Sequence, residues 1–180
     1  MKKDNEPLSL EDYKAFFETL GKNVISSATN MKGDIIYVND KFVEVSKYDR
    51  EELLGQNHRI VKSGFHPQEF YKALWKTISS GQVWRGEIKN KAKDSSYYWV
   101  DTSIAPILGP NEKPVKYVSV RFLITDQKNA EAEVAGQRTK EMERLSELEK
   151  FQKITVGREL KMVELKKEIA DLKKKIGESV

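Results

Sequence analysis

The sequence predicts an α+β domain followed by a long helix, and three observations support this. All five prolines, all three tryptophans and all seven tyrosines precede residue 126, whereas the remainder is mostly Glu, Lys, Ala, Leu, Arg and Gln, which favour helix. The first part contains five strand-like runs interspersed with turn residues and short helical patterns. A length of 180 residues suits one ordinary domain plus such a helix rather than two full domains.

The first predicted element is a short flanking helix within residues 1–22. Ser9 lies directly before the helical pattern and Asp12 follows three residues later, which is a capping-box arrangement. Two short strands are predicted next, over 24–29 and 35–38, and the Lys-Gly-Asp between them indicates a hairpin. We expect these two strands to pair in antiparallel fashion.

The middle of the chain is predicted to form three helices. Two short ones cover 40–47 and 50–54, and a longer one covers 68–79, between Pro67 and Gly81. Proline is favoured in the first turn of a helix and glycine just after its end, so both residues fit these boundaries.

Three further strands are predicted over 84–91, 97–108 and 115–124, where polar and apolar residues alternate or Val, Tyr and Phe are frequent. Two polar turns, 93–96 and 109–114, connect them. The complete order predicts a five-stranded antiparallel sheet with the short helices over one face.

Residues 126–177 are predicted to form a coiled-coil helix, followed by a tail at 178–180. Apolar residues step by three from Met142 to Ile154, and the pattern then changes phase near Gly157. A narrow apolar seam stabilises a helix only against a partner, and the simplest partner is a second copy of the chain. We therefore expect a homodimer; the alternative is a helix that folds back on its own domain. The seam after the phase change consists of Met162, Leu165, Ile169, Leu172 and Ile176.

Seven phrases within the first part of the chain occur in a recognisable order. They are residues 36–42 (IYVNDKF), 46–48 (SKY), 51–57 (EELLGQN), 74–75 (LW), 84–90 (WRGEIKN), 98–100 (YWV) and 124–128 (ITDQK). Together they resemble a PAS domain, a sensor module of bacterial signalling proteins. The resemblance implies a PAS sensor domain over residues 23–125.

Among PAS domains, the sequence is similar to the flavin-binding ones of aerotaxis receptors and of the nitrogen-fixation redox regulator. At 62–65 it departs from the aerotaxis pattern and is more like the regulator. The resemblance implies FAD or FMN as the cofactor. A concave interior with a few polar groups would also suit a planar ring. The candidate cofactor-binding residues are Asn39, His58, Trp75, Trp84, Asn90, Tyr98 and Ser103.

A purely structural role is the alternative for several of these residues. Trp75, Trp84 and Trp99 would then supply buried area in the core and sheet. Asn39 would satisfy backbone groups at a turn, as asparagine often does.

Composition and motifs exclude several other classes of function. The chain has no cysteine, so disulfides, thiolate zinc sites, a cysteine nucleophile and a flavin–cysteinyl adduct are excluded. His58 and His66 are the only histidines, and neither is placed as expected for a haem ligand. No catalytic motif is present, so we do not expect an enzyme. With 32 basic against 28 acidic residues, we expect no nucleic-acid partner.

The resemblance implies a sensor that reads redox state, oxygen or a small ligand. No apolar run suggests a membrane span or a secretion signal, so we expect a cytoplasmic protein. Thr125 and Asp126 match the family's junction motif, where the domain would pass its signal to the coiled coil. The output would be a domain or partner, in cis or in trans, such as the histidine kinase of a two-component system. The alternative is a cofactor-free PAS dimerisation adaptor.

Overall fold

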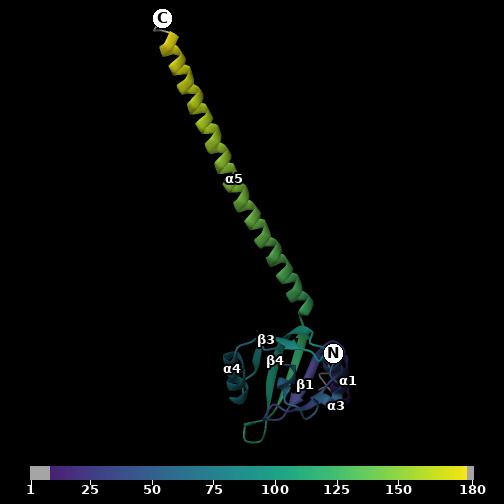
Figure 1. Ribbon diagram of the computed structural model, residues 1–180. Coiled ribbons are helices and arrows are strands. Elements are labelled where there is room, and N and C mark those ends of the chain that lie inside the picture. The colour runs from purple at the N-terminus through teal and green to yellow at the C-terminus, as the bar shows by residue number, and fades with distance from the viewer. Residues whose placement is uncertain (1–8, 178–180) are drawn as a thin grey trace, which may run out of the picture. The chain divides into compact units, whose positions relative to one another are not determined.

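A computed structural model describes residues 9–177, without the side chains of residues 17 and 175–177. Residues 1–8 and the predicted tail at 178–180 lie outside the described residues. In chain order the elements are α1 (Leu10–Gly21), β1 (Ile25–Thr29), β2 (Ile35–Val38), α2 (Asp40–Ser46), α3 (Arg50–Leu53), the 3₁₀ helix η1 (His58–Val61), α4 (Gln68–Ser79), β3 (Trp84–Lys91), β4 (Tyr97–Leu108), β5 (Pro114–Leu123) and α5 (Thr125–Gly177) (Figure 1).

The five strands form one antiparallel sheet in the order β2-β1-β5-β4-β3. The last strand in the sequence therefore lies in the middle of the sheet, between β1 and β4. Helix α4 packs against β3, β4 and β5, while α2 packs against β1 and α3 against β2 (Figure 1). The predicted α+β sheet with short helices is confirmed, and η1 is the one element that the sequence analysis did not predict.

The core lies between the sheet and these helices. Its largest fully buried side chains include Ile25 and Val100 from the strands and Phe42, Leu53 and Ile78 from the helices. Burying one such side chain contributes roughly 1.5–3 kcal/mol. This apolar layer fixes the helices over one face of the sheet.

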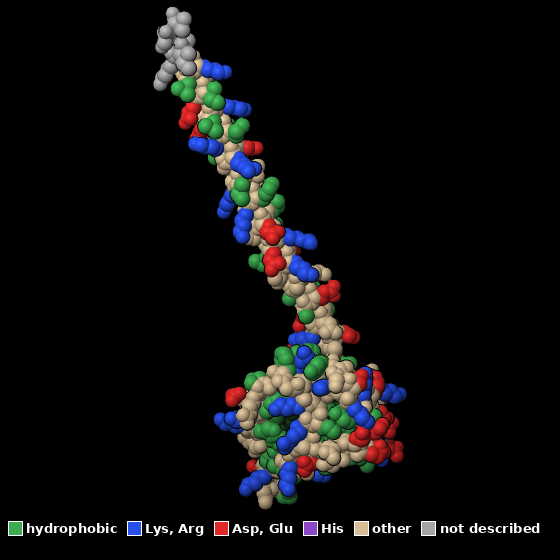
Figure 2. All heavy atoms as spheres, in the orientation of Figure 1, with side chains coloured by type: hydrophobic (Ala, Val, Ile, Leu, Met, Phe, Trp, Pro, Cys, Tyr) green, Lys and Arg blue, Asp and Glu red, His purple; other side chains and the backbone are tan. Residues whose placement is uncertain are grey.

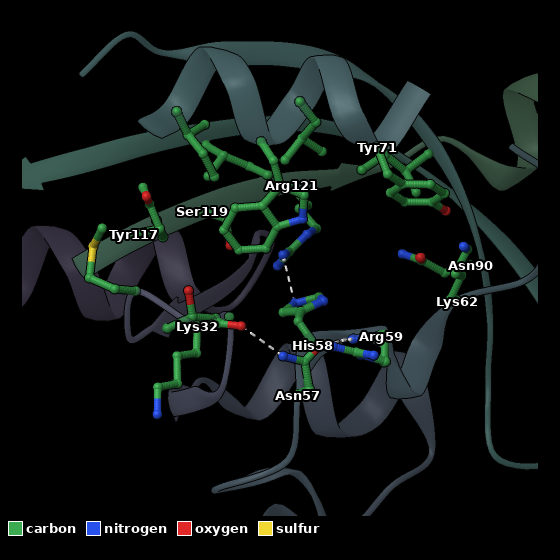
Figure 3. A pocket seen from close by; sticks show the side chains of 18 residues that line it. Lys32, Asn57, His58, Arg59, Lys62, Tyr71, Asn90, Tyr117, Ser119 and Arg121 are labelled. Atoms are coloured by element: carbon green, nitrogen blue, oxygen red, sulfur yellow. Dashed lines mark hydrogen bonds between the residues drawn. The ribbon is translucent and has the colours of Figure 1, made fainter. Parts of the chain in front are cut away.

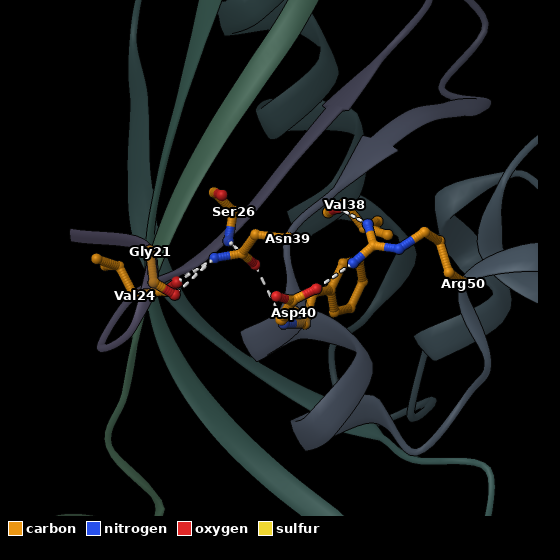
Figure 4. Close-up of polar contacts among 8 residues, drawn as sticks. Gly21, Val24, Ser26, Val38, Asn39, Asp40 and Arg50 are labelled. Carbon is orange, nitrogen blue, oxygen red and sulfur yellow. Dashed lines mark hydrogen bonds and ion pairs between the residues drawn. The ribbon is translucent and has the colours of Figure 1, made fainter. Parts of the chain in front are cut away.

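Asn39 ties three elements together at the edge of this core (Figure 4). Its Oδ1 accepts hydrogen bonds from Ser26 N at 2.9 Å and Phe42 N at 3.1 Å. Its Nδ2 donates to Gly21 O at 3.1 Å and Val24 O at 2.7 Å. An amide has two donors and two acceptor sites, so the side chain is fully satisfied. Asn39 thus joins the end of α1, the start of β1 and the N-terminus of α2.

The chain divides into two compact units, the first ending at Lys128 and the second beginning at Asn129. Helix α5 contributes all but its first turn to the second unit. Its 53 residues correspond to about 80 Å at 1.5 Å per residue. Apolar side chains such as Met142, Leu145 and Leu148 are exposed along the single chain. Of the helices in the described range, none is both long and apolar enough to cross a membrane.

We expect Asn39→Ala to lower the free energy of unfolding by about 2–4 kcal/mol, because it removes a helix cap and leaves further buried backbone groups without partners. Urea unfolding of the purified protein measures this loss. The matched control is Ser9→Ala, which removes an exposed cap from α1 and should cost about 1 kcal/mol or less. Equal losses in the two variants would show that Asn39 does not have this joining role.

Candidate functional site

A cavity of about 490 Å³ lies between the helices and the inner face of the sheet. Its walls come from the β1–β2 loop, η1, α4 and the three strands β3, β4 and β5. Cavities of roughly 300–1,000 Å³ are typical of small-molecule sites. The cavity is therefore large enough for a ligand of cofactor size.

One wall of the cavity is apolar and comes mainly from α4. Leu74 and Trp75 line it together with Ile88 from β3. The Trp75 ring meets the Tyr117 ring edge to face, with centroids 5.6 Å apart. Gly33 in the β1–β2 turn has φ +85°, and a Cβ there would lie only 3.0 Å from the Trp75 ring. Glycine at this position permits both the turn and the close approach of the ring.

A polar network lies across the middle of the cavity (Figure 3). Arg121 of β5 donates from Nη2 to His58 Nε2 at 2.8 Å and from Nη1 to Ser27 Oγ at 3.1 Å. The Ser27 hydroxyl is also 2.9 Å from that of Ser119. Arg121 and His58 point toward each other from opposite walls. The network therefore joins η1 to the two neighbouring strands β1 and β5.

The chemistry of arginine determines the protonation state of His58. A guanidinium only donates hydrogen bonds, so Nε2 of His58 must accept and the ring proton must be on Nδ1. Burial, together with the nearby Arg121 charge, lowers the pKa of His58 to about 3. Burial also lowers the pKa of Arg121 to about 10, so Arg121 is charged and His58 is neutral at pH 7.

Positive charge dominates the cavity. Lys32, Arg59 and Lys62 line it in addition to Arg121, and no Asp or Glu does so in the part of the chain that the structure describes. Lys62 Nζ lies 4.4 Å from the centroid of the Tyr71 ring. Lys and Arg side chains gather over the middle of one face of the domain, while Asp and Glu gather on its flank (Figure 2). The cavity is thus suited to an anionic ligand. Within residues 9–177, no cluster of His, Asp and Glu is placed to hold a metal ion.

Two buried hydroxyls at the cavity remain available to a ligand. The hydroxyls of Tyr71 and Tyr117 are buried and have no hydrogen-bond partner among the described residues, although both side chains line the cavity. Asn90 also lines it and is only 6% exposed. Buried polar groups without a partner are costly, and a ligand with polar edges would satisfy them.

Three of the predicted cofactor-binding residues come together in this cavity. His58, Trp75 and Asn90 come from η1, α4 and β3, and all three line it. They are separated in the sequence, so the fold is what brings them together. Their role in binding a cofactor stays a prediction.

The other four predicted residues do not line the cavity. Asn39 is used fully by the backbone, as described above. Trp84 packs edge to face on Phe70 at 5.5 Å and covers Gly86, where a Cβ would lie 2.8 Å from the ring. Tyr98 is buried within the core. Ser103 precedes Ile104, which lines the cavity, so strand alternation places Ser103 on the opposite face of the sheet.

Sequence reasoning missed Arg121, the most deeply buried charge at the site. It lies in a strand that is otherwise mostly apolar, two residues after Ser119 and four after Tyr117, and all three line the cavity. A charged residue in phase with the inward face of a strand is unusual. The two-residue spacing of Arg121 from Ser119 could have identified it from the sequence, but only once it is known that Ser119 faces inward.

At the junction between sheet and helix, Thr125 is bonded to the neighbouring strand. Its Oγ1 accepts a hydrogen bond from Trp99 N at 2.9 Å, and Ile124 N donates to Trp99 O at 2.9 Å. Asp126 follows within the first turn of α5. A carboxylate there is favourable, because the N-terminus of a helix carries partial positive charge.

We expect His58 to make the protein less stable as the pH falls below 6.5. Its pKa is about 3 when folded, against an ordinary value of 6.5, so the unfolded chain binds more protons between these values and stability is lost as pH falls through that range. Between pH 6.5 and 5 the loss from this group is roughly 2 kcal/mol.

Urea unfolding at pH 7 and at pH 5 tests this expectation in the wild type and in His58→Gln, which keeps an acceptor for Arg121. His66, whose pKa burial also lowers, is present in both proteins and cancels in the comparison. The variant should lose roughly 2 kcal/mol less than the wild type. The same loss in both would contradict a His58 that stays neutral in the folded protein.

Comparisons with known proteins agree with this architecture. Residues 35–121 match the family described as PAS fold. The nitrogen fixation regulatory protein of Klebsiella pneumoniae is 34% identical over 99 residues, which is 55% of this chain and 20% of that protein. The aerotaxis receptor of Escherichia coli K12 is 34% identical over 109 residues, which is 61% of this chain and 21% of the receptor. The matched stretch thus spans about a fifth of these relatives.

Solved structures show the same fold. An RNA-binding light-oxygen-voltage receptor superposes with a TM-score of 0.62 at 15% identity, covering 77% of this chain and 42% of that one. A PAS domain from Colwellia psychrerythraea superposes with a TM-score of 0.54 at 21% identity, covering 65% of this chain and 98% of that one. Because the matched residues, the strand order and these structures all agree, the sheet domain of this chain has the PAS fold.

Proposed function

We propose that this PAS domain is a signal sensor that binds a flavin, FAD or FMN, in its cavity and passes the state of that flavin through α5 to an output domain or partner. The observation that carries the proposal is the cavity, which combines apolar walls with unsatisfied polar groups and positive charge. These properties suit a planar ring with polar edges and an anionic tail.

The residues present fit a flavin in three ways. Trp75, Leu74 and Ile88 provide apolar surface for the ring faces. The hydroxyls of Tyr71 and Tyr117 have no hydrogen-bond partner, and Asn90 lines the same cavity, so these groups would contact the ring edges. When bound, the flavin would supply a two-electron redox centre that the protein can tune.

The exposed cations at the cavity would hold the phosphate of the cofactor. Lys32, Arg59 and Lys62 line the cavity and are exposed, and charge-assisted hydrogen bonds from such groups to phosphate are strong. Arg59 is already oriented by a 2.8 Å hydrogen bond from its Nε to Asn57 Oδ1.

The relatives support a sensor rather than an enzyme. Their names describe an aerotaxis receptor and a nitrogen fixation regulatory protein, and one structural neighbour is a domain of a blue-light activated histidine kinase. Because this chain has no cysteine, a light-driven cysteinyl adduct is excluded. We therefore favour redox state, oxygen or a small ligand as the signal. No Asp or Glu of the described residues lines the cavity to complete a set of acid, base and nucleophile such as catalysis would require.

The output would run through a dimer of α5. Met162, Leu165, Ile169 and Leu172 are exposed in the single chain, while the side chain of Ile176 lies outside the described residues. Pairing with a second copy would bury this seam. The helix contains no histidine, so a phosphoacceptor would have to lie in a partner or in another domain, such as a histidine kinase of a two-component system. We propose that the protein works in the cytoplasm, without nucleic acid.

A cofactor-free dimerisation adaptor is the second candidate. It is favoured by the exposed apolar side chains Leu10, Tyr13 and Leu20 on α1, which a second subunit would cover. The cavity and its uncompensated positive charge have no purpose in such an adaptor, so we rank it below the flavin sensor.

We expect freshly purified protein to be yellow, with flavin absorption near about 450 nm and with FAD or FMN released on denaturation. Absorption from 300 to 700 nm and mass spectrometry measure this.

Asn90→Ala should lower the flavin content several-fold because it removes a buried polar group at the cavity. Ser103→Ala, on the other face of the sheet, should not. A featureless spectrum would favour the adaptor, and equal losses in both variants would contradict the assignment of the cavity.

We expect Thr125→Val to uncouple the cavity from α5, because valine keeps the shape of threonine but removes the acceptor for Trp99 N. A cysteine introduced at Leu165 would be unique in the chain, so crosslinking it to its dimer mate with a bismaleimide reports the packing of the seam. The crosslinking yield should differ between protein with oxidised flavin and protein with reduced flavin, and Thr125→Val should abolish that difference. Thr125→Ser, which keeps the hydroxyl, should retain it. A difference that survives in Thr125→Val would contradict this route.

A further inference from the structure

Arg121 carries a charge that nothing in the described protein neutralises. Its side chain is only 4% exposed, and no carboxylate pairs with it among residues 9–177. Its guanidinium donates hydrogen bonds to Ser27 Oγ and His58 Nε2, which are both uncharged groups. Burying a charge without a counter-charge costs several kcal/mol. A fold that needed only a structural residue here would be more stable with an apolar one.

The surroundings hold the guanidinium in place. His58 stacks on Phe42 with centroids 5.5 Å apart and an angle of 17° between the ring planes, and Arg121 lies 5.5 Å from the centroid of the same Phe42 ring. His58 is therefore a positioning residue that orients Arg121 without cancelling its charge.

Donors of Arg121 remain for a ligand. The bonds to Ser27 and His58 use two of its five N–H groups, and the side chain lines the cavity. Figure 3 shows it extending into the space between the α4 wall and η1. An anion at this point would receive charge-assisted hydrogen bonds in a poorly solvated site, where they are strong.

We propose that Arg121 is the charge-selecting group of the cavity: it contacts the edge of the flavin ring that becomes negative on reduction, and so makes the protein bind reduced flavin more tightly than oxidised flavin. This inference rests on the proposed function.

The charge balance supports this role. When two electrons and one proton enter the ring, Arg121 compensates the single negative charge that remains. The electrons come from a reductant, which is dithionite in the test below and a reduced electron carrier in the cell, and the proton comes from water. Arg121 and His58 neither gain nor lose a proton, because the first stays charged and the second stays neutral near pH 7.

Tighter binding of the reduced state raises the reduction potential of the bound flavin. For a two-electron couple, each tenfold preference corresponds to about 30 mV. We expect Arg121→Gln to lose at least a tenfold preference and hence to lower the potential by about 30 mV or more. Arg121→Lys keeps the charge and should restore most of the wild-type value.

The test is an anaerobic dithionite titration of flavin-loaded wild type and variants against a reference dye. The matched control is Arg85→Gln, which makes the same charge change at an exposed residue of β3 that does not line the cavity; its potential should equal that of the wild type. A wild-type potential in Arg121→Gln, or a low one in Arg121→Lys, would overturn the inference.

A second measurement needs no variant and covers the case in which Arg121→Gln does not fold. Lumiflavin has no phosphate, so Lys32, Arg59 and Lys62 have no anionic tail to bind. The wild-type apoprotein should bind reduced lumiflavin at least tenfold more tightly than oxidised lumiflavin. Equal affinities would overturn the inference while leaving flavin binding intact. Failure to take up FAD, FMN or lumiflavin at all would instead reject the proposed function and, with it, this inference.

Discussion

The central position of β5 is the constraint on which the rest of the structure depends. This strand pairs with β1 on one side and β4 on the other, so its inward face lies at the middle of the sheet. Every second residue of a strand points to the same face, so this face carries Tyr117, Ser119 and Arg121, which line the cavity. The same strand leads directly into Thr125, which is bonded to Trp99 of β4. The element that presents charge to a ligand is therefore also the element that continues into α5.

Two buried polar residues show how the fold separates stability from function. Asn39 satisfies all its hydrogen-bonding capacity with backbone groups of three elements, so it stabilises the domain and has nothing left for a ligand. Arg121 is also buried but keeps an uncompensated charge. Proteins tolerate such local costs mainly at functional sites. The contrast explains why the buried arginine, and not the buried asparagine, identifies the site.

The fold could be predicted almost completely from the sequence, because local signals agree with the tertiary structure. The capping box at Ser9, Pro67 before α4 and the alternation in β3 all define elements close to those observed. The short η1 was missed, since four residues carry little periodicity. For the site, His58, Trp75 and Asn90 were predicted from resemblance and line the cavity. Arg121 was not predicted, because its importance follows from which residues surround it and not from its neighbours in the chain.

The most direct test of a flavin held against Arg121 is a crystal structure of the protein with the ligand it carries from purification. We predict a flavin ring between the α4 wall and β5, with the Arg121 guanidinium within about 3.2 Å of its polar edge. The phosphate should lie near the exposed lysines of the cavity. A phosphate group against Arg121, or a cavity that holds no flavin while the guanidinium still contacts only Ser27 and His58, would contradict the central claim.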